Sequence, residues 1–250
     1  MKLSFVIITF NEEKNIRACL ESIGSLASEI IIVDSYSSDR TIDIAKEFKA
    51  IIIQRKFDGY ITQKNFANEQ ANGEYIFSLD ADEKLSPELL TWLKDEKNFS
   101  NFDVISFNRK NWYCGKWMNF GGWYPDRKVR MWKNGKARWA GTMPHEQVLV
   151  NDGIKIHHLS VDILHHAYET VSQHIQKSMH YAQVAAYQYE KYSYWKLFGK
   201  LFFSGIFRFF RNVIFKLGIL DGWRGIVSAF ITTIEINYKY WLALEKKINS

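Results

Sequence analysis

The chain has 250 residues, of which 47% are hydrophobic and 16% aromatic, and its formal net charge is +6. This composition excludes a disordered or fibrous protein. It is sufficient for one sizeable hydrophobic core and a smaller appended unit.

Several features predict a protein that stays inside the cell. The two cysteines, Cys19 and Cys114, lack the spacing of a metal site or a disulfide framework, so we expect two reduced thiols. The first residues run straight into an apolar segment and lack the features of a secretory signal. No stretch of about eighteen uncharged apolar residues occurs, which argues against a transmembrane span. We therefore expect a cytoplasmic protein.

The first hundred residues alternate between apolar runs and helical patterns. Strands are predicted at 4–9, 29–33, 50–54 and 74–79. Helices are predicted at 13–23, 39–48 and about 63–71. A further helix should begin at Pro87, with Ser86 as its cap. Strands that alternate with helices predict right-handed crossovers and an α/β fold with a mostly parallel sheet.

Beyond residue 103 the pattern changes to the alternation that is typical of antiparallel strands. The segments 128–132 and 136–140 flank Asn134-Gly135, and an Asn-Gly pair between alternating segments predicts a β-hairpin. A second turn is predicted at 151–153. Beyond Tyr168 the pattern is helical again.

Polar residues follow three of the predicted strands at the points where they end. They are Thr9, Asn11, Glu12, Asp34, Asp80 and Asp82. Open α/β folds bind ligands at the carboxyl edge of the sheet, so this convergence predicts a site, although a single acid there is often a helix cap. The acid motif, Asp80-Ala81-Asp82-Glu83, brings carboxylates spaced two apart, which can share a hard divalent cation that also holds substrate phosphates.

Three ordered segments resemble the motifs of family 2 glycosyltransferases. They are 4–12, 32–41 and 79–83. Four later segments resemble a subgroup that adds a hexose to the inner core of bacterial lipopolysaccharide. They are 121–126, 145–146, 164–165 and 217–223. The resemblance implies a GT-A fold, in which helices flank a Rossmann-like, mostly parallel sheet. It also implies an inverting transfer of a sugar from a nucleoside diphosphate to an acceptor hydroxyl.

The resemblance further implies roles for individual residues. The donor-binding set is Thr9, Asn11, Glu12, Asp34, Lys64 and Asp80. Asp34 matches an acid that accepts a hydrogen bond from the base, which suits the imide of uracil. Asp82 and His165 match ligands of Mg²⁺ or Mn²⁺, which acts as a Lewis acid on the leaving diphosphate. The ordinary alternative for Lys64 is an exposed lysine at a helix start, and for Asp39 we favour a structural role as the cap of the second helix.

Sugar transfer needs a general base on the far side of the sugar from the metal. Many family members use the aspartate of a Glu-Asp pair, which this chain lacks. His145-Glu146 occupies the corresponding region, so we assign Glu146 as the base and His145 as its neighbour. The alternative is an ordinary strand glutamate.

Aromatic and basic residues gather in the segment that leads into the first strand of the predicted hairpin. We assign four of them to the acceptor: Trp123, Tyr124, Arg127 and Arg130. Aromatic rings can stack on sugar faces, and arginines can pair with acceptor phosphates. The same segment also fits a compact aromatic loop packed over the sheet, and both interpretations can hold together.

From Lys196 onward the chain has nine basic and three acidic residues, an excess equal to the net charge of +6. These bases lie among large apolar residues, which fits an element at a membrane interface, with Lys and Arg near anionic lipid. A helical cover of the core or a dimer surface is the alternative. Nucleic acid is not an expected partner.

Together these features predict a GT-A catalytic domain at 1–165, with donor binding in 1–100 and the acceptor and base in 101–165. A helical, membrane-interfacial extension follows at 166–250. UDP-glucose is the favoured donor, and a lipopolysaccharide core or other lipid-linked glycan is the acceptor, at the inner face of the bacterial plasma membrane.

Two alternatives belong to other classes of protein. A nucleotidyltransferase would normally have a Gly-rich basic loop after the first strand, where this chain has Phe10-Asn11-Glu12-Glu13. A catalytically silent membrane scaffold is the second, and the intact Asp80, Asp82 and Glu146 argue against it.

Overall fold

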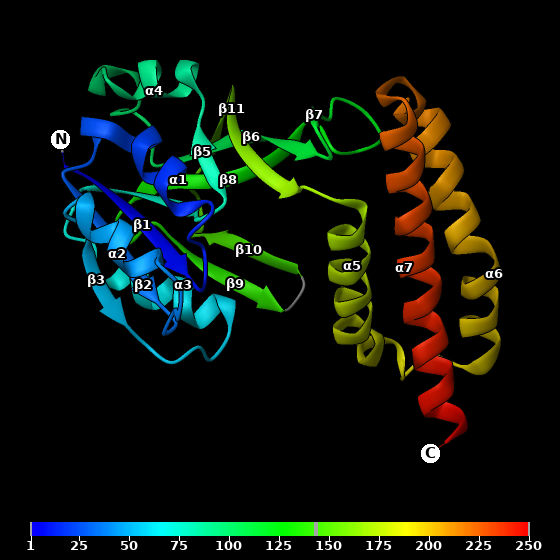
Figure 1. Cartoon of the computed structure of the whole chain (residues 1–250). Helices are drawn as coiled ribbons and strands as arrows, with labels where there is room; N and C mark the ends of the chain where they lie inside the picture. The colour runs from blue at the N-terminus through cyan, green and yellow to red at the C-terminus, as the bar shows by residue number, and fades with distance from the viewer. Residues whose placement is uncertain (1, 143–144, 250) are drawn as a thin grey trace. The chain divides into compact units, whose positions relative to one another are not determined.

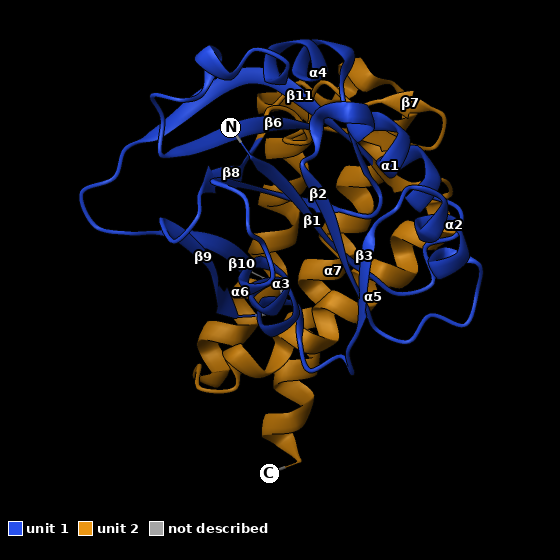
Figure 2. Ribbon diagram, turned by 90° about the vertical axis from the view of Figure 1, so that its left-hand side faces the viewer, with its two compact units in different colours: residues 1–109, 127–165 blue, residues 110–126, 166–250 orange. Residues whose placement is uncertain are grey.

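The computed structural model describes residues 2–142 and 145–249. The chain forms two compact units (Figure 2). Unit 1 comprises residues 1–109 and 127–165, and unit 2 comprises residues 110–126 and 166–250. Each unit is therefore built from two separate stretches of the sequence.

The main sheet begins with a parallel core and continues into antiparallel strands (Figure 1). The parallel strands, in spatial order, are β3 (Ile51–Gln54), β2 (Glu29–Asp34), β1 (Leu3–Thr9) and β4 (Tyr75–Asp80). The sheet then continues with β8 (Asp126–Lys133), β6 (Val104–Tyr113), β11 (Ile156–Tyr168) and β5 (Glu83–Leu85). A short strand, β7 (Lys116–Trp117), pairs with the end of β6. The predicted mixed α/β fold is confirmed.

Three helices connect the parallel strands: α1 (Ile16–Ile23), α2 (Thr41–Glu47) and α3 (Tyr60–Glu69). A further helix, α4 (Pro87–Leu93), follows β5. The predicted cap of α4 is confirmed, because the Ser86 hydroxyl accepts a hydrogen bond from the Leu89 amide. Helix α3 begins three residues earlier than the apolar pattern predicts, since Gly59, with φ of 121°, turns the chain into the helix at Tyr60.

The register of the parallel strands aligns their polar carboxyl ends. Thr9 of β1 lies opposite Asp34 of β2, and Ile8 lies opposite Asp80 of β4. The strand bodies are buried, and β4 is buried from Tyr75 to Leu79. An apolar interior therefore fixes the place where three polar strand ends meet.

The hairpin predicted at Asn134-Gly135 is wrong in its pairing. Both strands form, but β8 pairs with β4, and β9 (Ala137–Thr142) pairs with β10 (His145–Val150) in a separate two-stranded sheet. The Asn134 amide N–H donates to the Glu74 carbonyl at 2.8 Å, and its side-chain amide donates to the Ala71 carbonyl at 3.0 Å. These bonds fasten the turn to the start of β4. Residues 143 and 144, between β9 and β10, lie outside the described residues.

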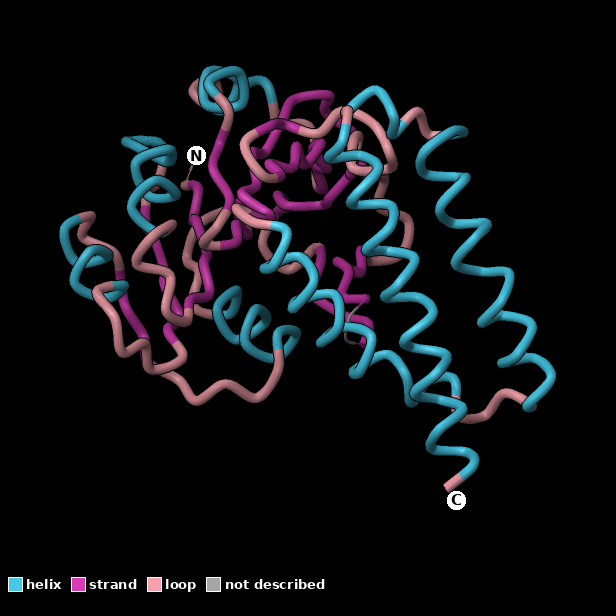
Figure 3. Tube along the Cα trace, turned by 45° about the vertical axis from the view of Figure 1, so that its right-hand side comes forward, coloured by secondary structure: helices cyan, strands magenta, loops and turns pink. Residues whose placement is uncertain are grey.

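Unit 2 is mainly helical. Its long helices are α5 (Val171–Ala186), α6 (Tyr194–Phe210) and α7 (Trp223–Ile248). Both α5 and α6 pack against α7 (Figure 3). A π-helical turn (Arg211–Phe215) and a 3₁₀ turn (Gly218–Asp221) join α6 to α7. In the part of the chain that the structure describes, no helix combines the length and the apolar character needed to cross a bilayer.

Candidate active site

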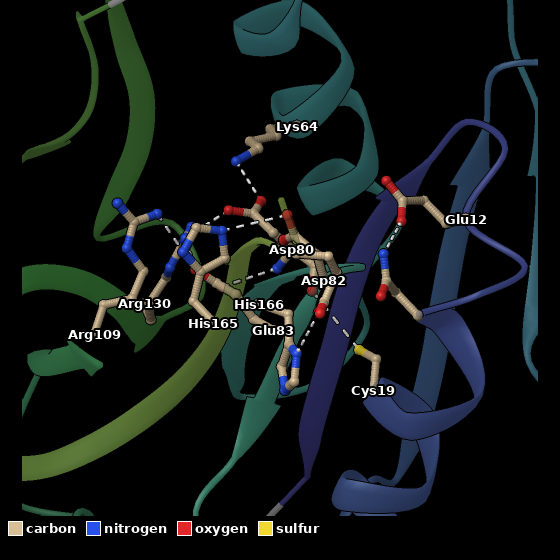
Figure 4. Close-up of polar contacts among 12 residues, drawn as sticks. Glu12, Cys19, Lys64, Asp80, Asp82, Glu83, Arg109, Arg130, His165 and His166 are labelled. Carbon is tan, nitrogen blue, oxygen red and sulfur yellow. Dashed lines mark hydrogen bonds and ion pairs between the residues drawn. The ribbon is translucent and has the colours of Figure 1, made fainter. Parts of the chain in front are cut away.

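The acid motif lies at the end of β4 and is held by basic side chains from three other elements (Figure 4). Lys64 of α3 contacts one carboxylate oxygen of Asp80 at 2.6 Å, and Arg130 of β8 contacts the other at 2.6 Å. Burial by itself would raise the pKa of Asp80. The positive charges of Arg130 and Lys64, and then of Arg109, instead hold that pKa well below its ordinary value. Asp80 is therefore an ionised, firmly placed carboxylate.

Arg130 also bridges to the other end of the motif. Its guanidinium contacts a carboxylate oxygen of Glu83 at 2.5 Å, and Arg109 lies 3.6 Å from the same oxygen. Glu83 is fully buried and Arg130 is 2% exposed. The second Glu83 oxygen accepts the Asp80 amide at 3.1 Å. Arg130, which the sequence groups with the acceptor residues, thus lies buried where it joins the two ends of the acid motif.

Trp139 of β9 lies beside both cations that contact Asp80. The Lys64 ammonium is 4.2 Å and the Arg130 guanidinium 5.6 Å from the centre of its indole ring. The indole N–H donates to the Ser78 hydroxyl at 3.3 Å. The aromatic face orients the two cations, since cations are attracted to the electron-rich face of a ring.

Asp82 and His165 come together from positions 83 residues apart. The strand β11 pairs with β5 so that His165 lies opposite Glu83, and the His165 Nε2 is 3.3 Å from the Asp82 Oδ2. The side chain of His165 is 12% exposed and that of Asp82 is 24% exposed. Neighbouring ligands in an octahedral shell at about 2.1 Å are about 3 Å apart, so the pair fits two positions around one hard cation.

No third protein ligand joins this pair among the residues that the structure describes, because these contain no group of three His, Cys, Asp or Glu side chains arranged for a metal. Mg²⁺ commonly keeps waters and substrate phosphate oxygens in its shell. The pair therefore fits a cation whose remaining ligands come from water and a bound phosphate.

The ends of β1 and β2 form a buried polar cluster. The Thr9 hydroxyl donates to Asp34 at 3.0 Å, and the Ser37 amide and hydroxyl donate to the same carboxylate at 2.8 Å and 2.5 Å. Thr9 is 3% exposed and Asp34 is fully buried. A carboxylate group has about four acceptor positions, so these three hydrogen bonds leave Asp34 room for one further donor.

Asn11 and Glu12 brace the loop after β1 against the loop after β2. The Asn11 amide N–H donates to the Ser37 hydroxyl at 2.8 Å, and its side-chain oxygen accepts the Ser38 amide at 2.8 Å. The Glu12 amide donates to the Thr41 hydroxyl at 2.7 Å. Asp39 has a structural role, because it accepts the Thr41 amide at 3.0 Å, but the N-cap of α2 is Arg40, so the predicted cap is wrong by one residue. These bonds preorganise both loops at the edge of the sheet.

Glu146 lies in β10 opposite Gly141, and its side chain is half-buried. The charge of Glu146 acts on Tyr60, a residue at the start of α3 that the sequence analysis did not single out. Burial raises the pKa of the Tyr60 phenol, and the negative charges of Glu146, Asp80, Asp82 and Glu12 raise it further. The charges of these four carboxylates thus act on one tyrosine. The signal available in the sequence was an aromatic residue directly after Gly59. The side chain of His145 lies outside the description.

Cys19 lies beneath the acid motif. Its thiol donates to the Asp80 carbonyl at 3.7 Å and is fully buried. Burial first, and then the charges of Glu83, Asp82 and Asp80, raise the pKa of this thiol well above its ordinary value. The sulfur therefore stays protonated and packs as a small apolar group.

The aromatic residues assigned to the acceptor lie in unit 2. The Trp123 indole N–H donates to the Ser228 hydroxyl at 3.2 Å, and its ring packs with Tyr113, Tyr168 and His174 at centroid distances of 5.3–6.1 Å. The centre of the Tyr124 ring lies 5.6 Å from the Lys110 ammonium. Trp123 thus fits the compact-loop interpretation, with its polar atom bonded inside the unit. Arg127, in unit 1, is exposed.

A parallel sheet with acids and basic counter-charges at its carboxyl edge is an arrangement suited to a nucleotide-sugar enzyme. Residues 4–153 match the model of glycosyl transferase family 2, and the chain belongs to this family. It is 26% identical over 261 residues to an uncharacterised glycosyltransferase of Rickettsia typhi, covering 98% of this chain and 89% of that protein. It is also 26% identical over 268 residues to the lipopolysaccharide core biosynthesis glycosyltransferase LpsC of Rhizobium meliloti, covering 100% and 97%.

Among solved structures, residues 1–349 of TarS from S. aureus match with a TM-score of 0.51 at 14% identity, covering 100% of this chain and 92% of that chain. A likeness at this identity concerns the fold. The protein is thus a glycosyltransferase with a GT-A fold, and the family match removes the nucleotidyltransferase alternative.

Proposed function

We propose that this glycosyltransferase moves a hexose, with glucose favoured, from a UDP-sugar to a lipopolysaccharide core or other lipid-linked glycan, with inversion at the anomeric carbon. One observation carries the donor assignment. Asp82 and His165 lie 3.3 Å apart beside an Asp80 that Lys64 and Arg130 hold. The similarity to LpsC along the whole chain supports the acceptor class.

The base and ribose would bind at the ends of β1 and β2. Asp34 is buried and retains acceptor capacity beyond its bonds from Thr9 and Ser37, so it can receive the imide N–H of uracil. Thr9 contributes by orienting that carboxylate. Asn11 and Glu12 keep the loop backbone in place around the nucleoside.

The diphosphate would bind at the acid motif. Asp82 and His165 would hold Mg²⁺ or Mn²⁺, and this cation supplies Lewis-acid stabilisation of the departing diphosphate. Asp80 positions the donor while Arg130 keeps its charge compensated. The Lys64 side chain is 12% exposed and that of Arg130 3%, so Lys64 is the cation that can exchange Asp80 for a phosphate oxygen.

The acceptor hydroxyl needs a base, and we assign Glu146. Its half-buried carboxylate is one of the four whose charge acts on the Tyr60 phenol, and it belongs to β10, a different strand from those that carry the acid motif. Removal of the hydroxyl proton by Glu146 would generate the nucleophile that displaces the diphosphate in one step. We assign Tyr124 and Arg127 to contacts with the acceptor, with Trp123 fixing the loop that carries Tyr124.

The proposal predicts selective binding of one class of donor. A screen of nucleotide sugars by thermal unfolding, with and without Mn²⁺, should give the largest stabilisation with a UDP-hexose plus Mn²⁺, since a ligand that binds only the folded state raises the melting temperature. The proposal would be contradicted by stabilisation from a different nucleotide class alone, or by UDP-hexose binding that ignores the cation.

A further inference from the structure

The connection between α6 and α7 in unit 2 presents an unusual concentration of exposed apolar side chains. We call six of them the apolar tip: Ile214, Phe215, Leu217, Ile219, Leu220 and Trp223. Each is 49–77% exposed. Further exposed aromatic side chains lie in α6, where Phe203 is 75% and Trp195 87% exposed. A concentration of large exposed apolar side chains usually marks a place where another apolar phase or partner binds.

Three cations lie where α6 meets this connection: Arg208 is in the last turn of α6, Arg211 begins the π-helical turn and Lys216 follows it. Burial, and then the charge of Arg211, lowers the pKa of Arg208, while Glu235 of α7 acts in the opposite direction. Burial, and then the charges of Arg211 and Arg208, lowers the pKa of Lys216. The bonds of the Arg211 guanidinium to Asn212 are long, at 3.5 Å. A cluster of like charges beside exposed aromatic residues is complementary to a surface that is anionic outside and apolar beneath.

The backbone holds the apolar tip in an outward-facing conformation. Leu217 has φ of 56°, a left-handed conformation that a leucine adopts rarely. Gly225 and Gly218 pack so closely that a Cβ atom on Gly225 would lie 1.8 Å from the Gly218 carbonyl oxygen. The apolar tip is therefore a built turn whose exposed side chains are fixed by close backbone packing beneath them.

The same turn is fastened to the loop that precedes Trp123. Asp221 is 1% exposed, and its carboxylate accepts the amides of Asn119 at 3.0 Å and Phe120 at 2.8 Å. The Gly121 amide donates to the Lys216 carbonyl at 2.8 Å. A buried carboxylate that accepts two backbone amides fixes the loop and the apolar tip as one piece.

We infer that the apolar tip inserts into the interfacial layer of an anionic phospholipid bilayer, with Arg208, Arg211 and Lys216 on the lipid phosphates. The inference rests on the proposed function in one respect, namely that the acceptor is carried by a lipid. Because the loop at 119–123 is bonded to the apolar tip, binding to the bilayer would place that loop at the surface where such an acceptor lies.

Co-sedimentation of the full chain with vesicles tests the inference. Wild type should pellet with phosphatidylcholine vesicles that contain phosphatidylglycerol and much less with phosphatidylcholine alone. The triple variant Arg208→Gln, Arg211→Gln, Lys216→Gln should bind anionic vesicles on the order of 100-fold more weakly, since each base near an anionic surface contributes about a fivefold factor. The matched control removes three exposed lysines of unit 1 (Lys94→Gln, Lys97→Gln, Lys136→Gln) and should retain binding.

A second pair of variants tests the apolar contribution. Phe215→Ser with Leu220→Ser should weaken binding to anionic vesicles on the order of 100-fold, because both side chains leave water on insertion. Leu149→Ser with Ile156→Ser changes two exposed apolar side chains of unit 1 and should not. Equal sedimentation of wild type and both tip variants would overturn the inference. So would a concentration-dependent dimer that the tip variants abolish, since a second copy would then cover the surface.

Donor binding in the same samples separates this inference from the proposed function. If wild type ignores vesicles but is stabilised by UDP-glucose with Mn²⁺, the membrane surface is refuted and the donor chemistry stands. If wild type binds anionic vesicles but no UDP-sugar stabilises it, the proposed function fails and the membrane surface stands.

Discussion

The acid motif of unit 1 and the apolar tip of unit 2 differ in how their charged side chains are arranged. Around the acid motif, Asp80 and Glu83 are paired with buried or half-buried cations within 2.5–3.6 Å. At the apolar tip, like charges gather beside exposed aromatic side chains. Compensated charge suits a compact ligand whose position must be fixed to a fraction of an ångström. A group of cations beside exposed apolar surface suits a broad anionic layer without fixed binding positions.

The largest effect should come from Asp82→Asn. Transfer should fall at least about 1000-fold, because the cation position loses its carboxylate while the fold is kept. The matched control is Asp152→Asn, an exposed acid in the turn after β10, which should keep wild-type activity. The measurements are the initial rate of UDP release and the melting temperature. Near wild-type turnover with Asp82→Asn would show that catalysis does not depend on a cation bound by Asp82.

Glu146→Gln should lower the rate of transfer about 100-fold to 1000-fold, since a positioned general base contributes in that range. Donor affinity should stay unchanged, because Glu146 acts on the acceptor. Single-turnover rates and the stabilisation by UDP-glucose separate the two effects. If the donor dissociates more readily while the bound rate is unchanged, Glu146 belongs to the donor site and another base is needed.

Arg130→Met should lower the free energy of unfolding by about 3–5 kcal/mol, because it leaves Asp80 and the buried Glu83 without their shared partner. Arg130→Lys should restore part of the loss. Denaturant unfolding of both variants and of the exposed control Arg138→Met measures this difference. A loss of similar size in Arg138→Met would show that the bridge across the acid motif contributes no more to the free energy of unfolding than an exposed arginine does.

The same variant should change the response to acid. The pKa of Asp80 lies well below its ordinary value of about 4, so its contribution to stability is complete above that value and is lost as the pH falls through the folded-state pKa. Removal of Arg130 raises the folded-state pKa towards the ordinary value. Acid unfolding of Arg130→Met should therefore begin at a higher pH than that of wild type, and an unchanged acid midpoint would contradict this.

The smallest effect should come from Lys64→Met. Arg130 remains on Asp80, so the acid motif should keep its position, while the diphosphate loses one point charge. We expect the KM for the donor to rise about tenfold and kcat to change less, because the variant loses one partly exposed charge that binds the donor. A larger change in kcat than in KM would indicate that Lys64 acts mainly on the transition state.

The sequence predicts the parallel core well but the later pairings poorly. Alternating apolar runs and helices locate β1 to β4, and the polar residues that follow them meet at one edge as expected. An Asn-Gly turn reverses the chain without choosing a partner strand, so the pairing of β8 with β4 is decided by tertiary contacts.

The contacts made by Arg130 and His165 depend on that later pairing. Arg130 reaches Asp80 because β8 lies beside β4, and His165 reaches Asp82 because β11 lies beside β5. Composition and periodicity carry no information about partners 50 or 83 residues away. The resemblance proposed His165 as a ligand, but nothing in the sequence predicted the Arg130 bridge between Asp80 and Glu83.

Calorimetric titration of UDP-glucose, with and without Mn²⁺, into wild type and Asp82→Asn tests the central claim most directly. We predict binding to wild type that depends on Mn²⁺ and a loss of that dependence in Asp82→Asn. Binding of equal affinity in both proteins, or an equal response to Mn²⁺ in both, would contradict the assignment of Asp82 and His165 to the diphosphate end of the site.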